Sequence, residues 1–127
     1  MIKLIKPYIK FREVKKAFKK VFFSGNFTKG IYVDRFRSDL SKYTGANHCH
    51  LTTSATTALS VSLKALGIKA GDEILISDFS FPATANVVED IGAVPVFVDV
   101  SLSTFNMLGT DLLRKITPKS KAVIFVD

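Results

Sequence analysis

From Asn47 onward, short apolar runs alternate with segments of helical spacing. The apolar runs predict strands over 48–52, 73–77, 94–100 and 122–126. Apolar positions three or four residues apart predict helices over 56–66, 83–91 and 109–116. Strands that alternate with helices are typical of a parallel α/β sheet, in which ligands bind at the carboxyl ends of the strands. We therefore expect the site in the loops after Thr52, Ser77 and Val100.

The first 45 residues follow a different pattern. Phe11, Val14 and Phe18 predict one face of a helix that begins at Pro7, because proline suits the first helical position. A second helix is predicted over 31–43, after a loop over 24–30 that contains two glycines. Residues 1–45 are thus expected to form a helical arm, and residues 46–127 the first part of an α/β domain.

The net charge of +7 is confined to the start of the chain, because residues 1–20 carry all of it and the other 107 residues are neutral overall. A basic amphipathic helix can bind nucleic acid or an anionic membrane. The favoured interpretation is instead a helix that packs through its phenylalanines and leaves its lysines in solvent. We therefore expect neither nucleic acid nor a membrane as a partner. The 47% hydrophobic content excludes a disordered tail, and no apolar run is long enough to span a membrane. A lone Cys49 excludes an intramolecular disulfide and favours the cytoplasm.

A cluster of hydroxyl residues over 52–57 lies between a predicted strand and a predicted helix. Free amides at a helix N-terminus bind phosphate, and Ala55 there permits close approach. The alternative is plain capping of the helix by Ser54 or Thr56. No Walker or dinucleotide-binding glycine motif is present.

Two further segments hold candidate chemistry. Phe79 and Phe81 follow a predicted strand, where a ring could stack on a planar ligand; ordinary core packing explains them equally well. His48 and His50 share one face of the predicted first strand with Cys49 between them. A structural zinc site needs four ligands, so no metal site is assigned.

Blocks along nearly the whole chain resemble the DegT/DnrJ/StrS sugar aminotransferases. They are IKPYI (5–9), SGNFTKG (24–30), TSATTAL (53–59), AGDEI (70–74), FSFPATAN (79–86), GAVPVFVDV (92–100) and ITPKSKAVI (116–124). Each block is short, and their order and spacing make the resemblance specific. It implies the large domain of a fold type I enzyme that uses pyridoxal 5'-phosphate. Such enzymes move an amino group from glutamate or glutamine to a nucleotide-linked keto-sugar in amino-sugar and polysaccharide biosynthesis, as homodimers.

The resemblance also implies roles for individual residues. Ala55 and Thr56 would bind the cofactor phosphate through their amides, Thr56 also through its hydroxyl, and Phe81 would stack on the pyridine ring. Many members have glycine where this chain has Ala55. The loop that holds Asn26, Phe27, Thr28 and Gly30 would lie near the substrate, in an active site shared between subunits.

The family's catalytic lysine, which forms the Schiff base, and the acidic partner of the pyridine nitrogen lie in motifs that this sequence does not contain. No catalytic residue is therefore assigned. We expect an N-terminal fragment of the enzyme that is inactive by itself. A non-catalytic, regulatory relative with the same fold is the alternative.

Overall fold

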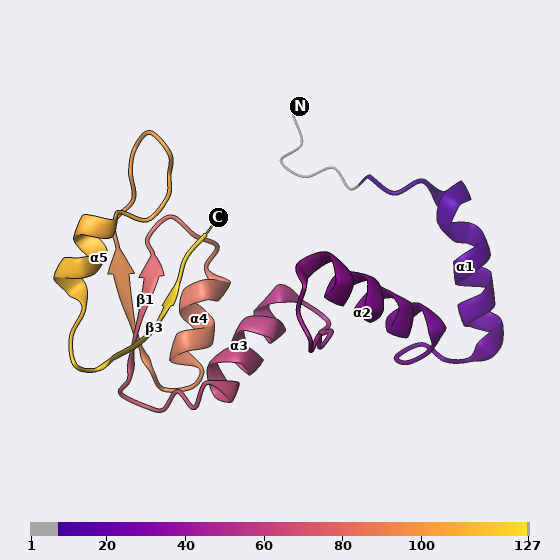
Figure 1. The fold of residues 1–127 in the computed structure, drawn as a ribbon, viewed down its shortest axis with the longest axis horizontal. Helices are drawn as coiled ribbons and strands as arrows, with labels where there is room; N and C mark the ends of the chain where they lie inside the picture. The colour runs from indigo at the N-terminus through magenta and orange to yellow at the C-terminus, as the bar shows by residue number, and fades with distance from the viewer. Residues whose placement is uncertain (1–7, 127) are drawn as a thin grey trace. The chain divides into compact units, whose positions relative to one another are not determined.

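A computed structural model of the chain describes residues 8–126. The expectation that a helix begins at Pro7 lies outside the described residues. The chain divides into two compact units, with the boundary between Leu51 and Thr52 (Figure 1). The two units are described separately below. None of the described helices is long and apolar enough to cross a membrane.

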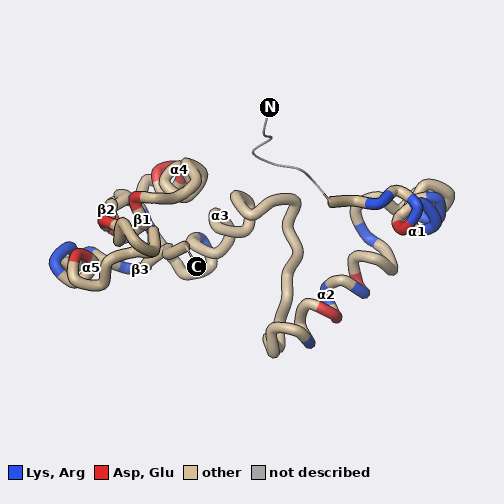
Figure 2. Tube along the Cα trace, turned by 90° about the horizontal axis from the view of Figure 1, so that it is seen from above, with Lys and Arg blue, Asp and Glu red and all other residues tan. Residues whose placement is uncertain are grey.

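The first unit contains two helices, α1 (Phe11–Ser24) and α2 (Ile31–Thr44). Each helix ends at a glycine in the left-handed region, Gly25 with φ 69° and Gly45 with φ 72°. Neither helix contains a buried residue, and lysine and arginine gather on α1 (Figure 2). The predicted amphipathic pattern therefore forms helices here without forming a core within the unit.

The strand predicted over 48–52 is wrong, because this segment has no regular secondary structure. A strand is stable only when its backbone groups bond to a neighbouring strand. Within residues 8–126, the sheet contains three strands and none of them pairs with this segment. The apolar run alone was insufficient to specify a partner.

The second unit is a small parallel α/β layer structure, which confirms the predicted fold class. Its elements are α3 (Ala55–Ala65), β1 (Glu73–Ser77), α4 (Ala83–Glu89), β2 (Val94–Val98), α5 (Gly109–Lys115) and β3 (Ser120–Ile124). The strand order is β2-β1-β3, and β1 is parallel to both neighbours. Leu75 of β1 lies opposite Val96 on one side and Val123 on the other.

The core of the second unit forms around the central strand β1. Ile74, Leu75 and Ile76 are each at most 1% exposed, as expected for a strand with neighbours on both edges. Val87 and Val88 of α4 are buried to the same extent and pack in one cluster with Ile74 and Ile76. Each such side chain contributes about 1.5–3 kcal/mol of burial free energy. This core holds the strand ends and the helix starts that form the candidate site.

Candidate functional site

The starts of α3 and α4 lie at the same edge of the sheet. Helix α4 follows β1 directly, so its first turn is at the carboxyl end of that strand. Helix α3 contacts α4 and runs in the same direction (Figure 1). The first turns of both helices therefore lie at the edge where parallel α/β proteins bind ligands. Ala55 and Thr56 are in the first turn of α3, and the residues just before Ala83 lead into α4.

The first turn of α3 combines a cap with two free amides. The Ser54 hydroxyl accepts a hydrogen bond from the Thr57 amide at 3.1 Å, so capping by Ser54 is confirmed. The Ala58 amide donates to the Ser54 carbonyl at 3.0 Å. The amides of Ala55 and Thr56 have no acceptor within residues 8–126, and both residues are exposed. Two donors at the positive end of the helix dipole are therefore available to an anion.

Phe81 presents an exposed ring just before α4. Phe81 is 78% exposed and Phe79 is 62% exposed, so neither ring lies in the core of the second unit. The backbone around the rings is held firmly. The Asp78 amide donates to the Val98 carbonyl at 2.9 Å, and the Thr84 amide donates to the Phe81 carbonyl at 2.9 Å. An exposed ring on a fixed backbone is suited to stacking on a planar group.

A third loop, over 99–108, follows β2 and is anchored by Asp111. This buried carboxylate accepts the Asp99 amide at 2.9 Å and pairs with Lys115 at 2.8 Å and Arg114 at 2.9 Å. The hydrogen bond from Lys115 is the main cause that lowers the pKa of Asp111 from its ordinary value, and the Asp99 amide acts in the same direction. Sequence analysis missed this anchor because a single aspartate in a short helix has no distinguishing pattern.

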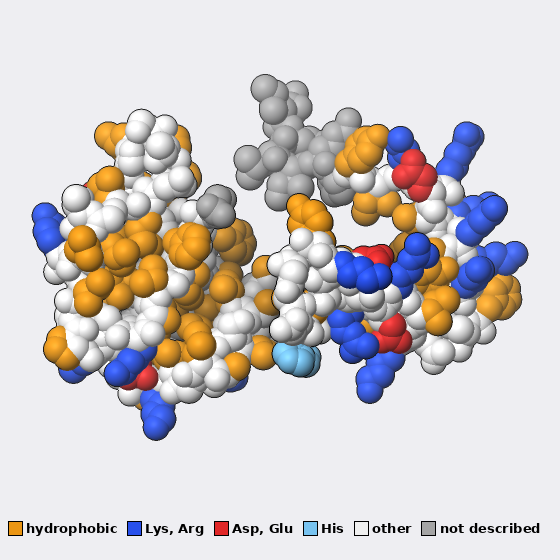
Figure 3. All heavy atoms as spheres, in the orientation of Figure 1, with side chains coloured by type: hydrophobic (Ala, Val, Ile, Leu, Met, Phe, Trp, Pro, Cys, Tyr) orange, Lys and Arg blue, Asp and Glu red, His pale blue; other side chains and the backbone are white. Residues whose placement is uncertain are grey.

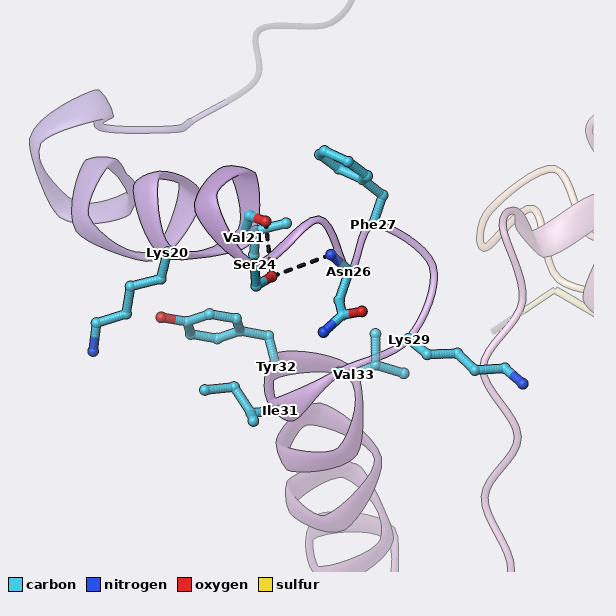
Figure 4. Close-up of a pocket in the computed structure, with 10 residues that line it drawn as sticks. Lys20, Val21, Ser24, Asn26, Phe27, Lys29, Ile31, Tyr32 and Val33 are labelled. Carbon is cyan, nitrogen blue, oxygen red and sulfur yellow. Dashed lines mark hydrogen bonds between the residues drawn. The ribbon is translucent and has the colours of Figure 1, made fainter.

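The loop with the predicted substrate-proximal residues belongs to the first unit. Asn26, Phe27 and Gly30 line a cavity of about 360 Å³ between the end of α1 and the start of α2. Figure 4 shows the Tyr32 ring reaching back from α2 toward the end of α1, whereas Lys29 extends away. Gly30 has φ 140°, a conformation that residues with a side chain rarely adopt. This φ explains why a glycine stands at the position where the backbone carbonyl accepts the first amide hydrogen bonds of α2.

Thr28 and the histidine segment lie at other cavities of the first unit. Thr28 lines a cavity of about 480 Å³ together with Cys49 and His50. His48 and His50 both line a neighbouring cavity of about 340 Å³ with residues of α2. Within the part of the chain that the structure describes, no three histidine, cysteine or acidic side chains are grouped to hold a metal ion.

The sequence matches the model of the DegT/DnrJ/EryC1/StrS aminotransferase family over residues 9–127. The chain belongs to this family. Among DegT/DnrJ/EryC1/StrS relatives, the spore coat polysaccharide biosynthesis protein SpsC of Bacillus subtilis is 40% identical over 101 residues, which are 80% of this chain and 26% of SpsC. The UDP-2-acetamido-2-deoxy-3-oxo-D-glucuronate aminotransferase of Pseudomonas aeruginosa is 33% identical over 112 residues, 88% of this chain and 31% of the relative.

A solved structure of the family extends this likeness to three dimensions. NtdA from Bacillus subtilis, with bound cofactor PMP (pyridoxamine 5'-phosphate), matches with a TM-score of 0.85 and 33% identity. The match covers 90% of this chain and 26% of NtdA. The chain thus spans about a quarter to a third of the length of these relatives.

The donors at the sheet edge fit the phosphorylated pyridine cofactor of this family. The free amides of Ala55 and Thr56 suit a phosphate, and the exposed Phe81 ring suits the flat pyridine. The Thr56 hydroxyl, which is not needed as the helix cap, adds a further donor.

Proposed function

We propose that this chain forms the phosphate-binding and ring-stacking part of a pyridoxal-phosphate-dependent sugar aminotransferase. The observation that carries the proposal is the pair of free amides on Ala55 and Thr56, at the sheet edge that also presents the Phe81 ring. Family membership and the PMP bound to NtdA support the same cofactor here. Pyridoxal phosphate, when bound, would supply an aldehyde group that takes up and passes on the amino group and a pyridine ring that withdraws electrons from it.

The residues of this chain bind and orient the cofactor. The Ala55 and Thr56 amides donate to phosphate oxygens, and the α3 dipole stabilises the negative charge. Ser54 keeps the first turn intact, because its hydroxyl holds the Thr57 amide and leaves the two preceding amides free. Phe81 covers one face of the pyridine, excludes water from it and keeps the ring in one orientation.

The proposed substrate is a nucleotide-linked keto-sugar, with glutamate or glutamine as the amino donor. The name of the Pseudomonas aeruginosa relative, which is a UDP-linked 3-oxo sugar aminotransferase, supports this substrate class. SpsC supports a place in polysaccharide biosynthesis. We place Asn26, Phe27, Thr28 and Gly30 near the sugar substrate, as the family resemblance implies. The cavity beside Asn26 has a mainly apolar lining, with the Asn26 amide among its polar groups.

We also propose that the whole protein acts in the cytoplasm as a homodimer. Exposed aromatic side chains on α1 and α2 support dimerisation, because Phe11, Phe22 and Phe36 are each more than half exposed within the unit. Large apolar surfaces of this kind are usually buried against another surface. The lone Cys49 is consistent with a reducing compartment.

Binding of pyridoxamine 5'-phosphate to this chain tests the cofactor site. This form carries an amine in place of the aldehyde, so it cannot react with the surface lysines. Ala55→Pro removes one free amide at the first position of α3, where proline is well tolerated. Ser54 has φ −158° and ψ 161°, an extended conformation compatible with a following proline. We expect about tenfold weaker binding by calorimetry, because one hydrogen bond to a charged group is lost.

Two controls make this test specific. Gly109→Pro makes the same change at the first position of α5 and should leave binding unchanged. Pyridoxamine without the phosphate should bind equally to the parent and to Ala55→Pro, whereas Phe81→Ala should weaken both ligands. The proposal is wrong if neither Ala55→Pro nor Phe81→Ala changes the affinity for pyridoxamine 5'-phosphate.

A further inference from the structure

Phe105 has an unusual backbone conformation. It is the only non-glycine residue within 8–126 with a positive φ, at 59°. This left-handed conformation costs a residue with a side chain about 1–2 kcal/mol relative to glycine, and asparagine adopts it most readily after glycine. A bulky aromatic residue therefore occupies a position where the backbone alone would favour a different residue.

The 99–108 loop holds Phe105 in this conformation through its own hydrogen bonds. The Phe105 amide donates to the Ser101 carbonyl at 2.7 Å, and the Ser101 amide donates to the Asn106 carbonyl at 2.9 Å. The base of the loop is closed by the Leu108 amide, which donates to the Asp99 carbonyl at 2.9 Å. Because Asp111 also accepts the Asp99 amide, the loop is attached to the carboxyl end of β2.

The Phe105 ring contacts the loop that presents Phe81. Its centroid lies 5.2 Å from that of Phe79, with the rings tilted by 35°. Phe79 stands two residues before Phe81, in the turn between β1 and α4. Hydrogen bonds hold the two ends of this turn, at Asp78 and Thr84. Two more reach its middle, one from the Ser77 hydroxyl to the Phe79 carbonyl at 3.5 Å and one between the Ser80 and Thr84 hydroxyls at 2.7 Å. The Phe105 contact adds the packing of a ring on the Phe79 side chain.

Core stability does not explain this contact. Phe105 is 52% exposed and Phe79 is 62% exposed, so the pair lies at the surface and adds little to the buried core. The strained backbone of Phe105 is therefore retained for what its ring touches.

We infer that Phe105 is a positioning residue, which packs on Phe79 and thereby holds the 78–82 turn so that the Phe81 ring faces the cofactor in one orientation. This inference rests on the proposed function, because it assigns the stacking role to Phe81. It adds the 99–108 loop to the cofactor site as its outer support. Phe105 itself touches Phe79 and not the reacting group.

The absence of tryptophan from the chain allows a direct test. Phe81→Trp introduces a single indole at the stacking position, and its time-resolved fluorescence anisotropy measures the motion of that ring. In this background, Phe105→Asn removes the ring but suits the left-handed backbone. We expect a larger amplitude of fast indole motion and an affinity for pyridoxamine 5'-phosphate that is about two- to tenfold lower, which corresponds to the loss of one aromatic pair.

Matched variants separate positioning from general stability. Phe105→Tyr keeps the ring and should restore both the anisotropy and the affinity. Leu102→Ala changes a residue of the same loop that is 90% exposed, and it should alter neither the anisotropy nor the affinity. The urea midpoint of Phe105→Asn should equal or exceed that of the parent, because the backbone strain is relieved.

Unchanged indole motion in Phe105→Asn would overturn the inference. The inference would also be overturned if Phe105→Asn lowered the urea midpoint and Leu102→Ala weakened the binding of pyridoxamine 5'-phosphate to the same extent. The loop would then act only on stability. If pyridoxamine 5'-phosphate binds to no variant, the proposed cofactor function fails, and the anisotropy still decides whether Phe105 positions the Phe81 ring.

Discussion

The two units of this chain use similar amphipathic segments with different results. In the second unit, helices pack on a three-stranded sheet, and Ile74, Ile76 and Val88 are completely or almost completely buried. In the first unit, α1 and α2 contain no buried residue, and Phe18 and Phe22 remain 57% and 67% exposed. Figure 3 shows basic side chains concentrated over the first unit and hydrophobic side chains gathered on the visible face of the second.

This difference shows that helical periodicity alone does not make a core. A helix buries its apolar stripe only when another element offers a matching surface. The second unit supplies that surface from its own sheet, with strands that are close in sequence to the helices that cover them. Over residues 8–51, the first unit has two helices joined by a short loop and no sheet, so the aromatic side chains of its helices stay available for another surface.

The largest expected effect contrasts a core side chain with an exposed one. Ile76→Ala leaves a cavity beside β1 and should lower the free energy of unfolding by about 2–5 kcal/mol. Phe18→Ala in α1 should change it by less than about 0.5 kcal/mol. Urea unfolding followed by circular dichroism measures both. An equal loss in Phe18→Ala would mean that the aromatic stripe is buried in solution, for instance against a second copy of the chain.

A smaller effect contrasts two glycines in the left-handed region. An added Cβ at Gly92 would lie 3.1 Å from the Ala70 Cβ, whereas at Gly25 it would meet no atom within 4 Å. Both alanine variants should lose about 1–2 kcal/mol from the backbone alone. Gly92→Ala should lose more than Gly25→Ala because of the contact with Ala70. Equal unfolding free energies for the two variants would show that this part of the second unit relaxes as freely as the first.

The smallest expected effect is on the pH dependence of stability, and it contrasts two paired aspartates, Asp111 in the second unit and Asp34 in the first. The folded protein lowers the pKa of Asp111 below its ordinary value of 3.8, so the carboxylate stabilises the fold fully above that pH. This contribution should fade as the pH falls through the lowered pKa. Urea midpoints from pH 7 to pH 2 should therefore differ between the parent and Asp111→Asn at neutral pH and converge in acid.

Asp34→Asn provides the control for this pH series. Asp34 pairs with Arg37 at 3.1 Å on α2, and its side chain is 65% exposed. Exposed ion pairs contribute little, so this variant should follow the parent at every pH. A difference between the parent and Asp111→Asn that persists unchanged at pH 2 would contradict the role assigned to the Asp111 carboxylate.

Much of the fold could be predicted from local patterns. The strand over 73–77 is predicted to the residue, and α2 and α4 begin at the predicted positions because Gly30 and Pro82 precede them. The last strand begins two residues earlier than predicted, since a hydrogen bond from the Glu73 amide to the Lys119 carbonyl starts its pairing with β1. The failure at 48–52 has the same origin, because pairing depends on a partner that is distant in sequence.

The candidate site shows the same division. The hydroxyl cluster before α3 and the aromatic pair after β1 were visible as motifs, since each occupies a few consecutive residues. The support of Phe79 by Phe105 and the anchoring of Asp99 by Asp111 involve pairs that are far apart along the chain. No local periodicity marks such pairs.

The sequence by itself determined the helix and strand segments of the second unit, the glycines that end the helices, and the family to which the chain belongs. These features depend on residues that are neighbours along the chain. Only the tertiary structure decided which strands pair and that Phe105 packs on Phe79. These contacts join segments that are far apart along the chain, so no local pattern of residues predicts them.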